Sequence, residues 1–181
     1  AVLLTALVGI AGSPFPFLPR QLTLIGTFSI GVPGFFLALA PNEALVKPGF
    51  LTRVLRFSLP AGAIAGAVTF AVYEVVRRMD DVELAEARTA ATATLLAIGL
   101  VILVVIARPL RPWKLGLATA MGGLYVLNMA VAELPVVGFL PFGRDYYELA
   151  LPTAAVWTVV AVASVAAGAA IVAITRFVLR D

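Results

Sequence analysis

Cysteine and histidine are both absent from the 181 residues of this chain. Their absence excludes disulfides, thiolate chemistry, haem ligation by histidine and most zinc or copper sites. Charged residues are also scarce, because they make up 13% of the chain, which is about half of the usual share in soluble domains. These absences leave carboxylates, hydroxyls and backbone groups as the candidate ligands of the chain.

Apolar sequence is abundant instead. Hydrophobic residues make up 62% of the chain, and the mean hydropathy is +1.06. No soluble core needs so much apolar sequence, so the composition predicts an all-α membrane protein. We expect a single transmembrane domain, 1–181, formed by a bundle of about six transmembrane helices. The expected helices cover residues 1–12, 20–40, 59–77, 89–107, 115–133 and 151–177.

The first expected helix, 1–12, is too short to span a membrane alone, because a spanning helix needs about 20 residues. No basic segment precedes its apolar run, which argues against a signal peptide. The chain also begins with Ala1 rather than with methionine. We therefore expect this helix to be truncated and the chain to be a fragment of a longer protein.

The stretch 19–42 is apolar enough to cross a bilayer, yet small, hydroxyl and proline residues interrupt its middle. In chain order they are Gly26, Thr27, Ser29, Gly31, Pro33 and Gly34. Proline leaves the carbonyl four residues before it without its usual donor. Within hydrocarbon, such a break is tolerated only where protein or a water-filled cavity meets the freed groups. We therefore expect the second helix to be unwound near Gly31 and Pro33.

Two interpretations of this break are open from the residues alone. Broken helices at mid-membrane often form ion or substrate sites. In that case the carbonyl around Ser29, which Pro33 cannot pair, would face the ion. In the alternative, the segment is a proline-kinked helix that packs against its neighbours and holds no ligand.

The charged residues divide unequally between the two sets of turns that alternate along the expected bundle. One side carries five basic and eight acidic residues, and the other carries eight basic and two acidic residues. By the positive-inside rule, the second side, which includes the C-terminus, is cytoplasmic in a plasma membrane. This topology accounts for the net charge of +3 without a nucleic-acid partner. The broken helix then runs from the outside to the cytosol.

Charged and glycine residues in the expected third helix also allow two interpretations. Glu74 is expected to pair with Arg77 or Arg78 one turn on, rather than to bind an ion. Gly62 and Gly66 have the GxxxG spacing of close helix contacts. They offer either a packing face against the broken helix or no more than the generic small-residue content of this segment.

Other polar features have mainly structural interpretations. Asn128 is expected to hydrogen-bond to a neighbouring helix, and the amphipathic segment 50–57 is expected to lie on the lipid headgroups or to contact a soluble domain. Threonine hydroxyls of the expected fourth helix can bond back to their own helix. These threonines are Thr89, Thr92 and Thr94.

The broken helix and its flanks resemble a known pattern. Its residues are Pro19-x-Gln21-Leu22, then Gly31-x-Pro33, then Leu37-Ala38-x-x-Pro41-Asn42. The pattern is similar to the sixth transmembrane helix of cation-pumping P-type ATPases, in particular the bacterial calcium- or magnesium-transporting pumps. The order of the expected helices resembles helices five to ten of that family.

The resemblance implies an ion translocase that hydrolyses ATP through a phosphorylated aspartate and moves a cation, Ca2+ or another divalent ion. Mg2+ and ATP would bind in cytoplasmic domains that, like the first four helices and the Asp-Lys-Thr-Gly-Thr motif, are absent from this sequence. The fragment alone would then be inactive and would hold no catalytic residue or cofactor. Its partners would be the lipid bilayer and those other parts of the same protein, with no nucleic acid.

The resemblance also implies which residues would contact the cation. Calcium pumps place an Asn, a Thr and an Asp on this helix, and the matching positions here are Gly26, Ser29 and Ile30. Because Ca2+ prefers about six to eight oxygen ligands that include carboxylates, the negative charge would have to come from elsewhere. The candidate metal ligands, through hydroxyls or backbone carbonyls, are Thr27, Ser29, Gly31 and Pro33.

Two alternatives use the same helices without ATP. The first is a secondary transporter or channel bundle whose ion path runs along the broken helix. The second is a non-catalytic membrane scaffold, in which ions would change neither stability nor the fluorescence of Trp113 and Trp157.

Overall fold

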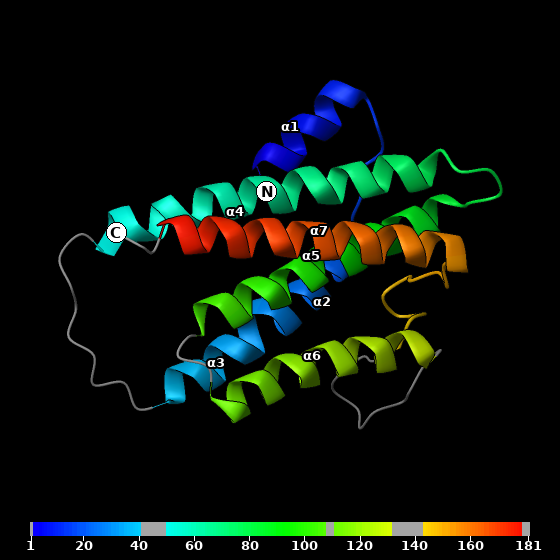
Figure 1. Ribbon diagram of the computed structural model, residues 1–181. Coiled ribbons are helices and arrows are strands. Elements are labelled where there is room, and N and C mark those ends of the chain that lie inside the picture. The colour runs from blue at the N-terminus through cyan, green and yellow to red at the C-terminus, as the bar shows by residue number, and fades with distance from the viewer. Residues whose placement is uncertain (1, 41–49, 108–110, 132–142, 179–181) are drawn as a thin grey trace.

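The computed structural model describes residues 2–40, 50–107, 111–131 and 143–178, and all regular structure in these ranges is helical (Figure 1). This confirms the predicted all-α membrane fold. The elements are α1 (Val2–Ala11), α2 (Pro19–Gly26), η1 (Thr27–Gly31), α3 (Val32–Leu39), α4 (Phe50–Arg77), α5 (Leu84–Ile106), α6 (Pro112–Ala130) and α7 (Ala154–Val178).

Helix α5 lies at the centre of the bundle. It packs against α4 and α7, and also against α2, η1 and α6, while α1 lies against α4 (Figure 1). Its buried residues are mostly alanines and threonines. In a bilayer the hydrophobic effect does not drive helices together, so small side chains that permit close packing become important. The composition of α5 therefore suits a helix with neighbours on several sides.

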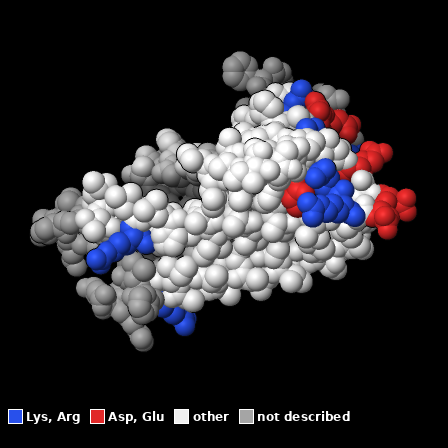
Figure 2. Space-filling view, turned by 90° about the horizontal axis from the view of Figure 1, so that it is seen from above, with Lys and Arg blue, Asp and Glu red and all other residues white. Residues whose placement is uncertain are grey.

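In the described ranges, four helical segments are long and apolar enough to cross a membrane: Pro19–Leu39, Val54–Arg77, Leu84–Ile106 and Ala154–Arg176. Helix α1 has only 10 residues, and α6, with 19 residues, is not among the four. Figure 2 shows a broad uncharged band across the molecule. At one end of this band both charge signs gather, whereas the charged residues visible at the other end are basic. This is the pattern of a multi-pass membrane protein.

Two helices begin five or more residues earlier than the sequence predicts. Helix α4 begins at Phe50 rather than at residue 59, so the amphipathic segment 50–57 forms the first turns of a 28-residue helix that passes through Pro60. Leucine and arginine favour helix, and an internal proline removes one hydrogen bond without always ending a helix in a membrane. Helix α5 begins at Leu84 rather than at residue 89, after a turn in which Asp81 has φ 60°.

The glycines of α4 do not face the broken helix. A Cβ added to Gly66 would lie 3.6 Å from Leu3 of α1, and one added to Gly62 would meet no atom within 4 Å. Of the two interpretations of these glycines, a packing face against the broken helix is therefore wrong. The physical reason is the position of α5, which is the helix that packs against η1, while Gly66 gives α1 close access to α4.

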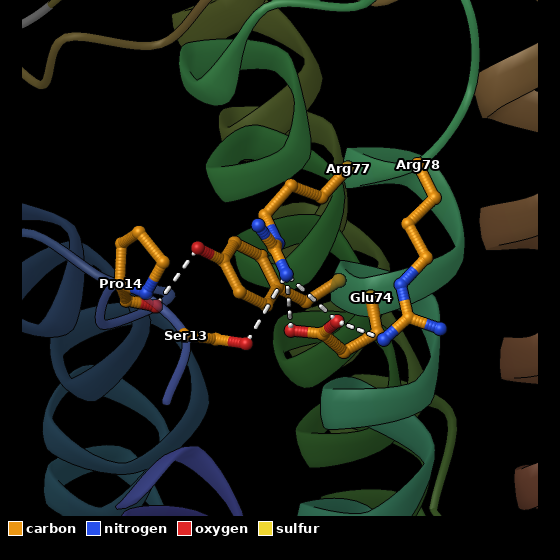
Figure 3. Close-up of polar contacts among 6 residues, drawn as sticks. Ser13, Pro14, Glu74, Arg77 and Arg78 are labelled. Carbon is orange, nitrogen blue, oxygen red and sulfur yellow. Dashed lines mark hydrogen bonds and ion pairs between the residues drawn. The ribbon is translucent and has the colours of Figure 1, made fainter. Parts of the chain in front are cut away.

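Glu74, near the end of α4, is paired as predicted (Figure 3). Its carboxylate lies 3.0 Å from the guanidinium of Arg77 and 2.9 Å from that of Arg78. Arg77 also donates a hydrogen bond to the hydroxyl of Ser13 at 3.2 Å. The cluster therefore connects α4 to the turn that follows α1, and it leaves Glu74 as a structural residue.

Two further hydrogen bonds hold the proline-rich turn between α1 and α2. The hydroxyl of Tyr73, whose side chain is fully buried, donates to the carbonyl of Pro14 at 2.8 Å. Arg88 of α5 donates to the carbonyl of Phe15 at 3.3 Å. Prolines leave the carbonyls of such a turn without regular helical donors. Side chains of α4 and α5 therefore satisfy them.

Removing the Glu74 carboxylate should loosen this corner of the molecule. The Glu74 side chain is only 9% exposed, so Glu74→Leu leaves two arginines without a partly buried partner. We expect a loss of stability of about 1–2 kcal/mol, between the values for exposed and fully buried pairs. Glu74→Gln, which keeps one acceptor oxygen, should lose less. Thermal unfolding of the full-length protein in detergent measures both changes.

The matched control is Asp80→Asn, which removes an exposed acid near the same end of α4. We expect its unfolding temperature to equal that of the wild type. If Asp80→Asn lowers the unfolding temperature as much as Glu74→Leu does, the ion-pair cluster has no special structural role.

Candidate functional site

The candidate site lies on the helical run Pro19–Leu39, in which α2, η1 and α3 follow one another directly. Element η1 is a π-helical turn, and the amide of Val32 closes it by donating to the carbonyl of Thr27, five residues earlier. Such a turn widens the helix locally. It occurs just ahead of Pro33, which cannot supply the donor that an α-helix would give to the carbonyl of Ser29.

This geometry corrects the predicted unwinding near Gly31 and Pro33. Gly31 is helical, with φ −63° and ψ −65°, and Pro33 lies in the first turn of α3. Because the π-turn that the Val32 amide closes already shifts the pairing of the preceding carbonyls, the helix continues through Pro33 although Pro33 has no N–H to donate. The irregularity is therefore a π-bulge at Thr27–Gly31 and not a break. Bulges of this kind are frequent at functional sites.

Ser29 lies against Gly99 where η1 contacts α5. Its hydroxyl donates to the carbonyl of Ile25, one turn earlier, at 2.6 Å, and its side chain is buried. A Cβ added to Gly99 of α5 would lie only 2.9 Å from the Cβ of Ser29. Real Cβ atoms do not approach so closely, so Gly99 is the residue that lets η1 reach α5.

The structure does not bring the four predicted ligands to one face of the helix. Ser29 and Pro33 are buried, whereas Thr27 and Gly31 are exposed. Ile30 lies beside the exposed pair and is 72% exposed. Successive residues of a helix turn to different faces, so a run of candidate ligands in the sequence cannot share one site unless the backbone opens.

The oxygen atoms of η1 that could bind a metal ion are neutral. In the described part of the chain, no group of three or more His, Cys, Asp or Glu residues could hold a metal ion. The available ligands are hydroxyl and backbone carbonyl oxygens, which suit hard cations such as Ca2+ but carry no net charge. The arrangement can therefore contribute neutral oxygens to a cation path.

Gln21 anchors the start of this helical run, and its side chain is fully buried. Its carboxamide oxygen accepts from the amide of Leu18 at 3.1 Å. It also lies 3.4 Å from the hydroxyl of Thr92 of α5, which shares its one hydrogen between this oxygen and the nearer carbonyl of Arg88 at 2.9 Å. The carboxamide nitrogen donates to the carbonyls of Tyr147 and Glu148, each at 3.3 Å. One side chain thus joins α2, α5 and the segment before α7. In the sequence Gln21 stands out only through the family resemblance.

Neighbouring residues strengthen the same junction. Arg20 donates to the carbonyl of Tyr146 at 2.7 Å and forms an ion pair with Glu148 at 3.2 Å. The hydroxyl of Thr89 accepts from the amide of Ala150 at 3.0 Å. Burial raises the pKa of the Tyr147 phenol, and the adjacent Tyr146 raises it further. The segment 143–150 is therefore attached to both α2 and α5 at this end of the bundle.

Helix α6 packs against η1, α3 and α5 and carries two buried polar side chains without partners. Both carboxamide atoms of Asn128 and the hydroxyl of Tyr125 are buried and form no hydrogen bond with the residues that the structure describes. The expected bond from Asn128 to a neighbouring helix is therefore not found. The threonines of α5 do bond back to their own helix, as predicted, at distances of 2.8–2.9 Å: Thr89, Thr92 and Thr94.

Gln21→Glu should lower the stability of the protein strongly, although the two side chains have nearly the same size. The variant keeps the acceptor oxygen but replaces the donor with a second oxygen that faces the carbonyls of Tyr147 and Glu148. Burying an unpaired charge costs more than the roughly 1–3 kcal/mol of an unpaired neutral group. We therefore expect Gln21→Glu to lose more stability than Gln21→Leu at neutral pH, as measured by thermal unfolding.

Acid pH separates this explanation from a simple packing defect. Protonation of the introduced carboxyl removes its charge and gives it a hydrogen that faces the two carbonyls. The protonated form can donate a hydrogen bond, so part of the stability should return as the pH falls and be lost as it rises. Thr23→Val, an exposed change on the same helix, is the control. A Gln21→Glu variant as stable as this control would contradict the anchoring role.

Comparison of the sequence with known proteins identifies relatives of the chain. The chain is 37% identical, across 98% of its length, to the calcium-transporting ATPase CtpE of Mycolicibacterium smegmatis. It is 38–39% identical, across 75% of its length, to the CtpE proteins of Mycobacterium tuberculosis and Mycobacterium bovis. The chain spans only 16–23% of the length of these relatives. No protein-family model matches the chain, and no solved structure gives a significant match.

These identities agree with the bundle of apolar helices and with the resemblance of residues 19–42 to the sixth helix of cation pumps. Identity of 37% extends over almost the whole chain, so the similarity is not confined to one motif. The chain therefore belongs to the family of CtpE-type P-type ATPases, as a segment that corresponds to about a quarter or less of their length.

Proposed function

We propose that this chain forms helices five to ten of an ATP-driven cation pump, and that α2, η1 and α3 line part of the pathway for Ca2+ or another divalent cation. The observation that carries the proposal is a π-turn within a membrane-spanning helix of a CtpE-type ATPase. Calcium transport by the relatives supports the choice of cation. The π-turn supports the place, since it alters the pairing of backbone carbonyls.

In this proposal the π-turn supplies neutral oxygens. The buried hydroxyl of Ser29 and the carbonyls before Pro33 are the inner candidates, and Thr27 with Gly31 are the outer ones. A divalent cation in a low-dielectric site also needs carboxylates. These carboxylates, the bound Mg2+ and ATP, and the phosphorylated aspartate belong to parts of the pump outside this segment. The segment alone is then inactive.

The proposed orientation follows the charges. The turn after α4 carries both signs, whereas Arg56, Lys114 and Arg176 are basic residues toward the opposite ends of their helices. Under the positive-inside rule, that basic end faces the cytoplasm of a cell with the pump in its inner, plasma membrane. The run Pro19–Leu39 then leads from outside to inside, and the C-terminus is cytoplasmic.

The test measures cation-stimulated ATPase activity of the full-length pump as the cation concentration varies. Ser29→Ala keeps the Cβ that packs near Gly99 but removes the hydroxyl. Loss of one neutral ligand worth about 1 kcal/mol should weaken the apparent cation affinity roughly fivefold. Pro33→Ala restores an N–H that can pair with the carbonyl of Ser29, so it should also weaken the affinity.

Two further variants separate ligand loss from packing. Gly99→Ala should lower stability, because its Cβ would lie 2.9 Å from the Cβ of Ser29. Adding Ser29→Gly should relieve this clash and restore stability without restoring cation affinity. Thr119→Ala is the control, since Thr119 is an exposed threonine of α6 that bonds only to its own helix.

Unchanged affinity in both Ser29→Ala and Pro33→Ala would remove this helix from the cation site. Phosphoenzyme formation from ATP tests the larger proposal separately. A full-length protein that transports the cation without forming an acid-stable phosphoenzyme would be a secondary transporter or channel instead of a pump.

A further inference from the structure

An apolar groove runs along the surface of the bundle between α5 and α7. Its volume is about 760 Å³, and it is open to the exterior of the described bundle. Helix α5 contributes Ala97 and Val101, and the rest of the lining comes from α7 between Ser164 and Arg176. The groove lies within the membrane-spanning segments of both helices.

Small residues keep this groove open. Gly168 forms part of its floor, where an added Cβ would lie 3.4 Å from Val101 across the helix interface. Ala169 and Ala173 continue the lining one turn apart along α7. Branched Val101 and Val172 stand beside them. The result is a long groove whose lining is apolar except for Ser164 and Arg176.

The length of the groove fits one lipid chain. Twelve residues separate Ser164 from Arg176, and a helix rises about 1.5 Å per residue, which gives about 18 Å. The hydrocarbon core of a bilayer is about 30 Å thick, so each leaflet contributes about half of that. The groove therefore extends over the acyl region of a single leaflet.

A positive charge lies at one end of the groove. Arg176 is exposed and belongs to the last turn of α7. Among the described residues it forms no ion pair, because the four ion pairs there involve other arginines. A guanidinium binds phosphate oxygens through paired hydrogen bonds. Basic pockets between transmembrane helices bind anionic lipid headgroups.

We propose that this groove binds one anionic phospholipid, with an acyl chain along Ala169 and Gly168 and its phosphate on Arg176. The proposal rests on the membrane location of the chain and is independent of which cation is pumped. The apolar side chains that line most of the groove suit an acyl chain. The charge at one end alone also suits a headgroup.

The experiment uses the full-length pump, purified from vesicles with equal amounts of phosphatidylglycerol and phosphatidylcholine. Native mass spectrometry counts the lipids that remain bound. We expect the wild type to retain phosphatidylglycerol preferentially. Arg176→Gln should reduce that preference about fivefold, the effect of one basic residue near the membrane surface. Ala169→Phe, which fills the groove, should reduce retention of both lipids.

Two matched controls lie outside the groove. Arg56→Gln removes another exposed arginine, on α4, and Ala161→Phe adds an aromatic ring at an exposed position of α7. Both should retain lipid as the wild type does. Cation-stimulated ATPase activity confirms that each variant is folded.

Three outcomes would overturn the proposal. The first is that the wild type retains phosphatidylglycerol and phosphatidylcholine equally. This outcome does not depend on whether any variant folds. The second is unchanged retention in both Arg176→Gln and Ala169→Phe. The third is a second copy of the protein retained in the spectrum and lost in Ala169→Phe, which would make the groove an interface between copies. Failure of this lipid site would leave the ATPase and phosphoenzyme tests of the pump unaffected.

Discussion

The close approach of Ser29 to Gly99 determines how the irregular helix fits into the bundle. At this contact a Cβ on Gly99 would lie 2.9 Å from Ser29, so only glycine permits the observed distance between η1 and α5. A π-turn in hydrocarbon has carbonyls whose pairing differs from that of an α-helix, and protein must shield them. Helix α5 provides that cover on one face. The position of η1 therefore depends on a residue more than sixty positions away in the sequence.

The start and the middle of the run Pro19–Leu39 are held against α5 by different interactions. At its start, Gln21 and Arg20 bond to α5 and to the segment 143–150. At its middle, Ser29 contacts α5 by packing, because its hydroxyl donates its hydrogen bond to Ile25 of its own helical run. Hydrogen bonds fix direction more strictly than small-residue packing does. The orientation of α2 against α5 is therefore held by directional hydrogen bonds that the described contact between Ser29 and Gly99 lacks.

Hydropathy was sufficient to predict the membrane class and the helices, since spanning a bilayer requires long apolar runs. Local patterns could not give the ends of α4, because the amphipathic segment 50–57 reads equally well as a separate interfacial helix. They misplaced the irregularity as well: Pro33 signals a lost hydrogen bond, but whether the backbone unwinds or forms a π-turn depends on the packing around it. The role of Gly99 and the partner of Gly66 required the tertiary structure for the same reason.

Asn128 shows why polar residues in this bundle are not equivalent. Threonines of α5 satisfy their hydroxyls on carbonyls of their own helix, so burial costs them little. The carboxamide of Asn128 is fully buried, and neither of its polar atoms is paired within the described part of the chain. Leaving a buried polar group unpaired costs about 1–3 kcal/mol, a cost that an apolar residue of similar size would avoid. Packing alone therefore does not explain an asparagine on the face of α6 that contacts the bundle.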